Sequence, residues 1–310
     1  MILSIVFIEI FIIFSKFNFN NFEGSIYMLQ YFMPHKYKHI LNRDCTPKLE
    51  YFCKVDEVSS VMPRAMHVHE NLVEVLLVYE GSGIYTIDNN KYIAKKGDLI
   101  FYNSGVVHDE FGGNGSNLGT YCLGISNIKI VKLGNNKIIE DNYCPIINCN
   151  EYFDDILSMF DIIRKSIDVD GIHVAEFSNF LVQALVVKFR IIIEKNGDVK
   201  QIKEPSLATK VKIYIDKNYN ENISLKSIAE AVNANQYYLS HIFKEETGFS
   251  PMQYVTRRRI GEAQNLLINT QLSITEIAAN VGYNNSNYFQ NVFKKIVGYT
   301  PGSYRKRWQV

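Results

Sequence analysis

An internal repeat in the last third of the chain constrains the fold more than any other feature of the sequence. The segment that begins at Ser224 recurs at Ser273, an offset of 49, and the offset grows to 50 near the end of the repeat. Each copy has a Ser suited to cap a helix, an Ile-Ala pair, a short polar turn and a second apolar stripe at helical spacing. The repeat therefore predicts two helix-turn-helix motifs, at 224–245 and 273–295.

The charge distribution indicates where a polyanion would bind. From Leu207 to Val310 there are 13 Lys and Arg and 7 Asp and Glu side chains, a net charge of +6, whereas the whole chain carries only +1. A basic segment attached to an acidic remainder is typical of a chain in which one domain contacts nucleic acid. We therefore expect DNA binding to be confined to residues 207–310.

The outward face of the second helix in each motif holds side chains that suit base recognition. Asn and Gln can bond adenine, Ser can bond either base type, and an aromatic ring can lie against a thymine methyl. The predicted base-reading residues are Tyr237, Ser240, His241, Ser286, Asn287, Gln290 and Asn291. Basic side chains nearby are predicted to contact phosphate, which positions a protein on DNA without reading sequence. They are Arg257, Arg258, Arg259, Lys294 and Arg305.

The preceding part of the chain has two different periodicities. Between Tyr51 and Ile125, short apolar runs alternate with Gly, Asp and Asn, which predicts an all-β sandwich or barrel. Residues 151–195 have helical spacing and predict two amphipathic helices. One shared face in the second helix consists of Phe177, Phe180, Leu181, Ala184 and Val187. The polar stretch 196–206, which contains Gly and Pro, is predicted to be a linker.

Four residues of the β-rich region form a candidate ligand set. His67 and His69 are separated by one residue, so both point to the same face of a strand. Glu74 follows them, and His108 lies in a later block. Three imidazoles and one carboxylate suit a divalent transition metal such as Fe, Mn, Ni or Zn. The alternative is that the same residues line the pocket of an organic effector without a metal.

Two resemblances arise from these residues. The run Phe243-Lys244 with Gly248, repeated before Gly298-Tyr299-Thr300-Pro301, resembles the AraC/XylS family of transcription regulators. The His/Glu set with its flanking glycines resembles the cupin family. Two departures from the second cupin motif are Asn103 in place of Pro and Gly112 in place of Asn. Many AraC relatives have Arg where His241 and Asn291 stand, so we expect fewer guanine contacts and more A·T-rich recognition.

The resemblances imply an α+β multidomain chain. They imply a cupin-like barrel, a double-stranded β-helix, as an effector-sensing domain at 28–150. A helical dimerisation or packing segment follows at 151–195, and an all-α AraC-type DNA-binding domain with the two motifs at 207–310. The implied partners are double-stranded promoter DNA, a small-molecule effector such as a carbohydrate, a second copy of the chain, and RNA polymerase if the regulator is an activator.

Three functions follow from these patterns. The first is a ligand-responsive DNA-binding regulator without catalytic activity, the second a metal-dependent cupin enzyme fused to a DNA-binding domain, and the third a membrane-anchored sensor. Only the apolar run at residues 1–14 supports the third, and it is too short to span a bilayer. The five cysteines are odd in number and include no C-x-x-C pair, which favours a reducing cytoplasm.

The first 27 residues are predicted to be a leader that is not translated. They have no place in either domain, and Met28 offers an alternative start. The codons for Glu23-Gly24-Ser25 can form a purine-rich stretch that resembles a ribosome-binding site just before Met28. The alternative is that these three residues are an ordinary turn.

Overall fold

The computed structural model of the chain describes residues 39–308, apart from 43, 57–63, 89, 112–116, 169–170, 172 and 198–205. The predicted leader, 1–27, and most of the predicted linker, 196–206, lie outside the described residues. So does Gly112 of the second cupin motif. The described residues belong to one compact unit, His39–Val310.

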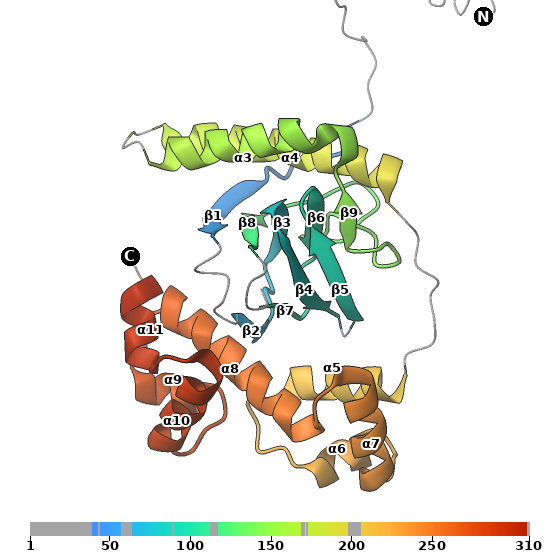
Figure 1. Cartoon of the computed structure of the whole chain (residues 1–310), viewed down its shortest axis with the longest axis vertical. Helices are drawn as coiled ribbons and strands as arrows, with labels where there is room; N and C mark the ends of the chain where they lie inside the picture. The colour runs from blue at the N-terminus through green and yellow to red at the C-terminus, as the bar shows by residue number, and fades with distance from the viewer. Residues whose placement is uncertain are drawn as a thin grey trace, which may run out of the picture. The chain divides into compact units, whose positions relative to one another are not determined.

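The first part of the described chain is built from two antiparallel β-sheets (Figure 1). One has the strand order β1-β8-β3-β6-β9, and the other has the order β2-β7-β4-β5. Strands that are far apart in sequence are neighbours in both sheets, as in a jelly-roll barrel and unlike a simple meander. The strands are β1 (Lys48–Val55), β2 (Arg64–His67), β3 (Leu72–Glu80), β4 (Ser82–Ile87), β5 (Asn90–Lys95), β6 (Asp98–Tyr102), β7 (His108–Phe111), β8 (Gly119–Ser126) and β9 (Ile146–Asn148).

Strand β3 explains how a polar residue comes to lie inside the barrel. Its side chains alternate between two apolar clusters because successive residues of a strand point to opposite faces. Val75 and Leu77 belong to the cluster under the helices, whereas Leu76 and Val78 belong to the cluster between the sheets. Glu74 has the same parity as Leu76 and Val78, so its carboxylate points into the barrel, where it is fully buried.

Helices α3 (Phe153–Ile167) and α4 (Val174–Asn196) cover the outer face of the five-stranded sheet (Figure 1). The face of α4 that packs on the sheet includes Val182, Leu185 and Phe189, each with no exposed surface. The face that the spacing indicated is a different one, because Phe180 on it is 62% exposed. Apolar residues surround most of α4, and periodicity alone does not decide which stripe is buried.

The rest of the described chain is helical and contains the two predicted motifs. Ser224 and Ser273 cap the first helix of each motif, and both complete a capping box. Gly248 and Gly298 end the second helices with positive φ angles of 81° and 88°. The helices are α5 (Leu207–Asn218), α6 (Leu225–Ala231), α7 (Gln236–Thr247), α8 (Pro251–Asn269), α9 (Ile274–Asn280), α10 (Ser286–Val297) and α11 (Pro301–Trp308). The structure thus confirms the predicted α+β organisation.

None of the helices in the described part of the chain has both the length and the apolar character needed to cross a membrane.

Candidate functional site

The second helix of the first motif, α7, presents a polar and aromatic face to solvent. Asn235 caps this helix by accepting hydrogen bonds from the backbone N–H groups of Tyr237 and Tyr238. Leu239 and Phe243 bury the opposite face. Tyr237, at 84% exposure, and His241 are exposed, and Ser240 is half-buried. The three predicted base-reading residues of this motif therefore lie on the side of α7 that is away from the core.

The corresponding helix of the second motif, α10, has the same design. Asn285 caps it, and Phe289 and Phe293 are buried. The predicted readers Asn287 and Asn291 are exposed, and Ser286 and Gln290 are half-buried. The structure adds Tyr288 to this surface, at 62% exposure. Tyr288 was not among the residues predicted from the sequence to read bases.

Arg258 and Arg259 have structural contacts instead of the predicted exposure to phosphate. The Arg258 side chain is 2% exposed, lies 3.6 Å from an Asp216 carboxylate oxygen and stacks 4.4 Å from the centroid of the Tyr219 ring. Arg259 donates hydrogen bonds to the carbonyl oxygens of Tyr219 and Glu221. The burial of Arg258 contradicts its predicted contact with DNA, and Arg259 is engaged in joining α8 to the end of α5.

The other predicted phosphate contacts divide into two kinds. Arg305 donates to the carbonyl oxygens of Leu267 and Leu272, so this guanidinium ties α11 to the end of α8. Arg257 forms an ion pair with Asp109 of β7, with 3.2 Å between Nη2 and Oδ2. Lys294 is exposed at the end of α10. Of the five predicted residues, Lys294 keeps the exposure that a phosphate contact requires.

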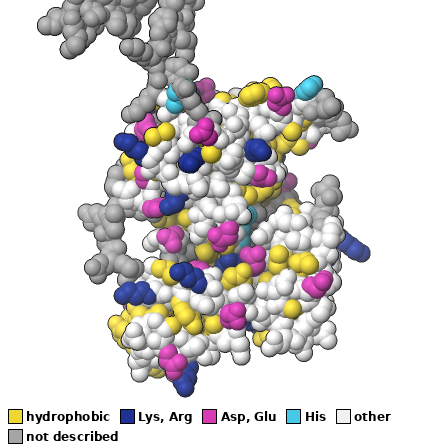
Figure 2. Space-filling model, turned by 180° about the vertical axis from the view of Figure 1, so that it is seen from behind, with side chains coloured by type: hydrophobic (Ala, Val, Ile, Leu, Met, Phe, Trp, Pro, Cys, Tyr) yellow, Lys and Arg dark blue, Asp and Glu magenta, His cyan; other side chains and the backbone are white. Residues whose placement is uncertain are grey.

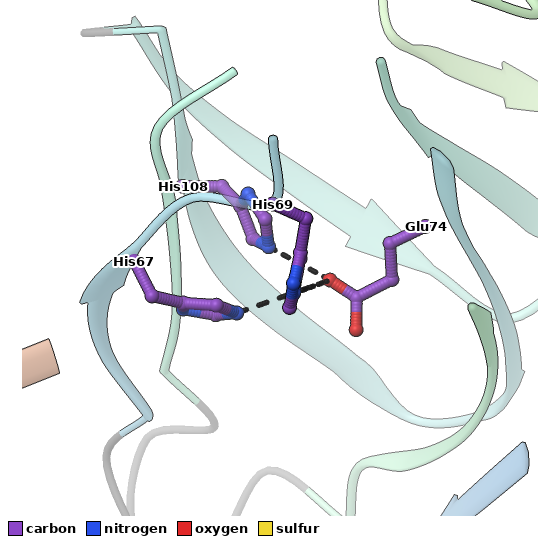
Figure 3. A group of neighbouring side chains, drawn as sticks. All are labelled: His67, His69, Glu74 and His108. Carbon is purple, nitrogen blue, oxygen red and sulfur yellow. Dashed lines mark hydrogen bonds and ion pairs between the residues drawn. The ribbon is translucent and has the colours of Figure 1, made fainter. Parts of the chain in front are cut away.

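The predicted ligand set converges inside the barrel. His67, His69, Glu74 and His108 each offer one ligand atom, and these atoms all lie within 4.8 Å of one another (Figure 3). The side chains come from β2, the turn after it, β3 and β7. The Nε2 atoms of His108, His69 and His67 lie 2.8, 3.5 and 3.9 Å from Glu74 Oε2. The resemblance to the cupin family thus correctly identified four residues that the fold brings together.

The hydrogen bonds of His108 indicate that a proton or a metal cation must lie between His108 and Glu74. Its Nδ1 lies 2.9 Å from the carbonyl oxygen of Val106, which only accepts, so Nδ1 carries a hydrogen. Burial lowers the pKa of His108 and favours the neutral ring. A neutral ring with this tautomer presents the Nε2 lone pair to a Glu74 oxygen 2.8 Å away. Two acceptors this close require a proton or a metal cation to bridge them.

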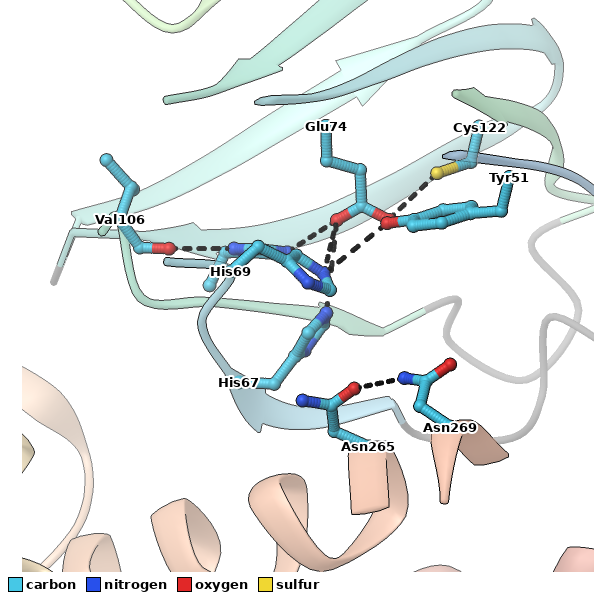
Figure 4. A network of polar contacts seen from close by, with 9 residues as sticks. Tyr51, His67, His69, Glu74, Val106, Cys122, Asn265 and Asn269 are labelled. Carbon is cyan, nitrogen blue, oxygen red and sulfur yellow. Dashed lines mark hydrogen bonds and ion pairs between the residues drawn. The ribbon is translucent and has the colours of Figure 1, made fainter. Parts of the chain in front are cut away.

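Two further residues contact the same carboxylate and were missed in the sequence. The hydroxyl of Tyr51 and the thiol of Cys122 both donate to Glu74 Oε1, at 2.9 and 2.8 Å (Figure 4). Tyr51 lies on β1 and Cys122 on β8. Their inward positions follow from strand alternation, but the register of β1 on β8 is needed to bring them to Glu74. No short motif in the sequence encodes that register.

The donor set fits a divalent transition metal. Three imidazole nitrogens and a carboxylate oxygen are the ligands that Fe, Mn, Ni and Zn share. The bond from His108 Nδ1 to a backbone carbonyl is typical of metal-bound histidine, because it orients the ring and directs Nε2 at the ion. Tyr51 and Cys122 would orient the second oxygen of Glu74 in the same way.

Comparisons with known proteins support the assignments of both the β-rich part and the helical part of the chain. It matches a helix-turn-helix domain family over residues 228–307 and a cupin domain family over residues 58–114. An uncharacterised helix-turn-helix transcriptional regulator, YdiP of Escherichia coli K12, is 27% identical over 270 residues, which cover 85% of this chain and 88% of YdiP. The lactose operon transcription activator of Staphylococcus xylosus is 25% identical over 238 residues, 76% of this chain and 84% of the activator.

Among solved structures, the C-terminal domain of AraT, a response regulator from Geobacillus stearothermophilus, is 35% identical. The match covers 35% of this chain and 91% of the AraT domain, with a TM-score of 0.34.

Two helix-turn-helix motifs in tandem behind a cupin-type barrel define a DNA-binding transcriptional regulator. The chain is an AraC-family helix-turn-helix transcriptional regulator with an N-terminal cupin domain. The relatives that span most of its length are transcriptional regulators.

The buried position of Arg258 leads to a stability prediction. We expect Arg258→Ala to lower the free energy of unfolding by about 3 kcal/mol, because it removes the charged partner of Asp216 and Glu262 from the core. Lys306→Ala, at an exposed basic position, should change it by less than about 0.5 kcal/mol. Urea denaturation followed by circular dichroism measures both. Equal effects of the two substitutions would contradict the structural role of Arg258.

Proposed function

We propose that this regulator responds to a ligand in its cupin pocket and reads promoter DNA in the cytoplasm as a homodimer. In this proposal, residues 28–150 sense the effector, 151–195 form the dimer and 207–310 bind DNA. RNA polymerase would be a further partner if the regulator is an activator. The observation that carries the ligand response is the position of the pocket residues on β2 and β7.

Strands β2 and β7 connect the pocket to helix α8. His67 and His108 are directly paired across the two strands and point into the barrel. Their neighbours Met66 and Asp109 point the other way because strand residues alternate. Met66 is 3% exposed and packs in the apolar cluster of α5 to α8, and Asp109 pairs with Arg257 of α8. Figure 4 shows Asn265 and Asn269 of α8 close to His67.

This alternation supports a direct path from effector to DNA-binding domain. A ligand that moves His67 or His108 also moves Met66 or Asp109, and with them the contact surface of α8. Helix α8 joins the two helix-turn-helix motifs, so its displacement changes how they meet the DNA. A ligand that binds one arrangement more tightly than the other would thereby change promoter affinity.

For DNA recognition, we propose that α7 and α10 enter successive major grooves, about one helical turn apart. The exposed amides of Asn287 and Asn291 support adenine contacts, and the exposed rings of Tyr237 and Tyr288 support contacts with thymine methyl groups. In this proposal Lys294 contacts phosphate. Arg257 would be free to do the same only when its ion pair with Asp109 opens.

Asn291→Ala tests the reading role of α10. We expect it to cost about 1–3 kcal/mol on the preferred site and to relax the preference at particular base pairs, because it removes a contact with a base edge. Lys294→Ala is the control: it should weaken all sequences about equally and make the salt dependence shallower by about one ion. Selection from randomised sites with each variant measures both, and identical base preferences for Asn291→Ala and wild type would contradict the assignment.

We further propose that the effector includes a divalent transition metal bound by His67, His69, Glu74 and His108. The close approach of these acceptors supports a cation. A carbohydrate is a second candidate, since one relative is a lactose operon transcription activator. The alternative of a cupin enzyme relies on the same four residues, but the relatives over most of the chain are transcriptional regulators.

Titration of the metal-depleted full chain with Zn²⁺ tests the metal. We expect stoichiometric binding by calorimetry, and His69→Ala should weaken it by at least ~10-fold, because one of four ligands is lost. His69 is the most exposed of the three histidines, so its replacement disturbs the core least. His173→Ala, at a histidine 84% exposed on its side chain, is the matched control and should bind as wild type does. If Zn²⁺ does not bind, the metal proposal is wrong and the carbohydrate remains as the candidate effector.

The dimer proposal uses the outward face of α4. Phe177, Phe180, Ala184 and Ile191 are exposed along one side of this helix. Their spacing of three, four and seven residues gives a stripe of the kind that pairs two helices. Figure 2 shows hydrophobic side chains on the surface of the helical layer at the top of the view. In a two-fold symmetric dimer, each subunit would bury its own apolar stripe against the stripe of the other.

Phe180→Glu should weaken the dimer by at least ~10-fold, because it places an unpaired carboxylate in the apolar stripe. Ile93→Glu on β5, at a residue 76% exposed and outside this stripe, should leave the dimer unchanged. Sedimentation velocity over a range of concentrations measures both. A wild-type chain that sediments as a monomer throughout would refute the proposal.

A further inference from the structure

Two cysteines face each other on the wall of the sensor pocket. Cys53 of β1 and Cys122 of β8 are direct partners in the antiparallel ladder. Directly opposed residues of an antiparallel pair lie on the same face, with Cβ atoms about 4.5–5.5 Å apart. Both residues belong to the apolar cluster between the sheets, Cys122 as a buried member and Cys53 as a partly buried one.

Neighbouring residues confirm that this face is the inner one. The Tyr51 side chain, two positions before Cys53, reaches Glu74 inside the barrel. Tyr51 pairs with Gly124, where a Cβ atom would lie 2.2 Å from the Tyr51 ring. Gly124 therefore leaves the space into which this ring packs. Tyr51 opposite Gly124 and Cys53 opposite Cys122 are thus successive inward rungs of one ladder.

The exposure of the two thiols differs in a useful way. Cys53 is half-buried, and an oxidant can reach it more easily than the buried Cys122. Among the strands that the structure describes, β1 lies at the edge of its sheet and pairs with β8 alone, so it can approach β8 without breaking a second ladder. A disulfide needs Cβ atoms about 3.5–4.5 Å apart, so the movement required is about 1 Å. Cys149, in contrast, is buried where burial raises its pKa to about 12, which makes it unreactive.

We propose that Cys53 and Cys122 are an oxidant-responsive dithiol, which closes to a disulfide in the wall of the sensor pocket. A hydroperoxide oxidises Cys53 first: the sulfur attacks one peroxide oxygen, the O–O bond breaks, and a sulfenic acid forms. The Cys122 sulfur then attacks the Cys53 sulfur, the S–O bond breaks and water leaves. With hydrogen peroxide, two thiols and one peroxide yield one disulfide and two waters, so two electrons pass from sulfur to oxygen.

Closure of this disulfide changes the pocket directly. The Cys122 thiol donates to Glu74 Oε1, and a disulfide sulfur has no hydrogen to donate (Figure 4). Tyr51, two residues from Cys53, donates to the same oxygen and moves with β1. Oxidation therefore removes one donor from the Glu74 carboxylate and shifts another. This gives the pocket an input from oxidants in addition to the proposed effector, and it does not depend on a bound metal.

The test uses the reduced full chain in the presence of a chelator, so that metal-catalysed oxidation does not contribute. After treatment with hydrogen peroxide and blocking of remaining thiols, non-reducing proteolysis and mass spectrometry should find a peptide that joins Cys53 to Cys122. Dithiothreitol should reverse the link. Cys53→Ser should abolish it, and Cys144→Ser, at another half-buried cysteine, should retain it.

Two results would overturn the proposal. One is peroxide-treated folded protein that contains only sulfinic or sulfonic acids, or links that involve other cysteines. The other is a link between Cys53 and Cys122 that appears only after the chain is unfolded in urea. Because the key variant changes the half-buried Cys53 rather than buried Cys122, circular dichroism of Cys53→Ser can verify that it folds before it is oxidised.

Discussion

The carboxylate of Glu74 is the constraint on which the cupin domain depends. A buried charge is costly unless hydrogen-bond donors or a cation surround it, and Glu74 has no exposed surface. Its partners come from β1, β2, β7 and β8 and from the turn after β2, so one group ties both sheets together. A change in the hydrogen-bond donors or cations around this carboxylate therefore affects several strands at once.

The strands that supply residues to the His67/His69/Glu74/His108 cluster also supply contacts outside the barrel. On β2 and β7 the inward residues are His67 and His108, and the outward ones are Met66 and Asp109, which contact the helical domain. On β1 and β8 the inward residues include Cys53 and Cys122. Ligand binding and oxidation would thus reach the same carboxylate from opposite walls, the first of which contacts α8.

In the DNA-binding domain, charge has two separate uses. Arg258 and Arg259 hold α8 against α5 and the turn after it, and Arg305 holds α11 against α8. These contacts tie α8, which connects the two motifs, to α5 and α11. The positions predicted to read bases on α7 and α10 carry amides, hydroxyls, an aromatic ring and the imidazole of His241 instead. Positive charge there is limited to residues such as Lys294 at the helix end.

The sequence by itself determined the features that lie within one element or repeat. The two motifs, their Ser caps, the His67/His69 pair and the outward faces of α7 and α10 follow from short spacings, because helix and strand periods are local properties. Glu74 and His108 were joined to that pair by the resemblance to the cupin family. Only the tertiary structure decided which arginines are buried, which face of α4 packs on the sheet, and that Tyr51 and Cys122 reach Glu74. These depend on strand register and helix packing, where residues far apart in the chain compete for the same space.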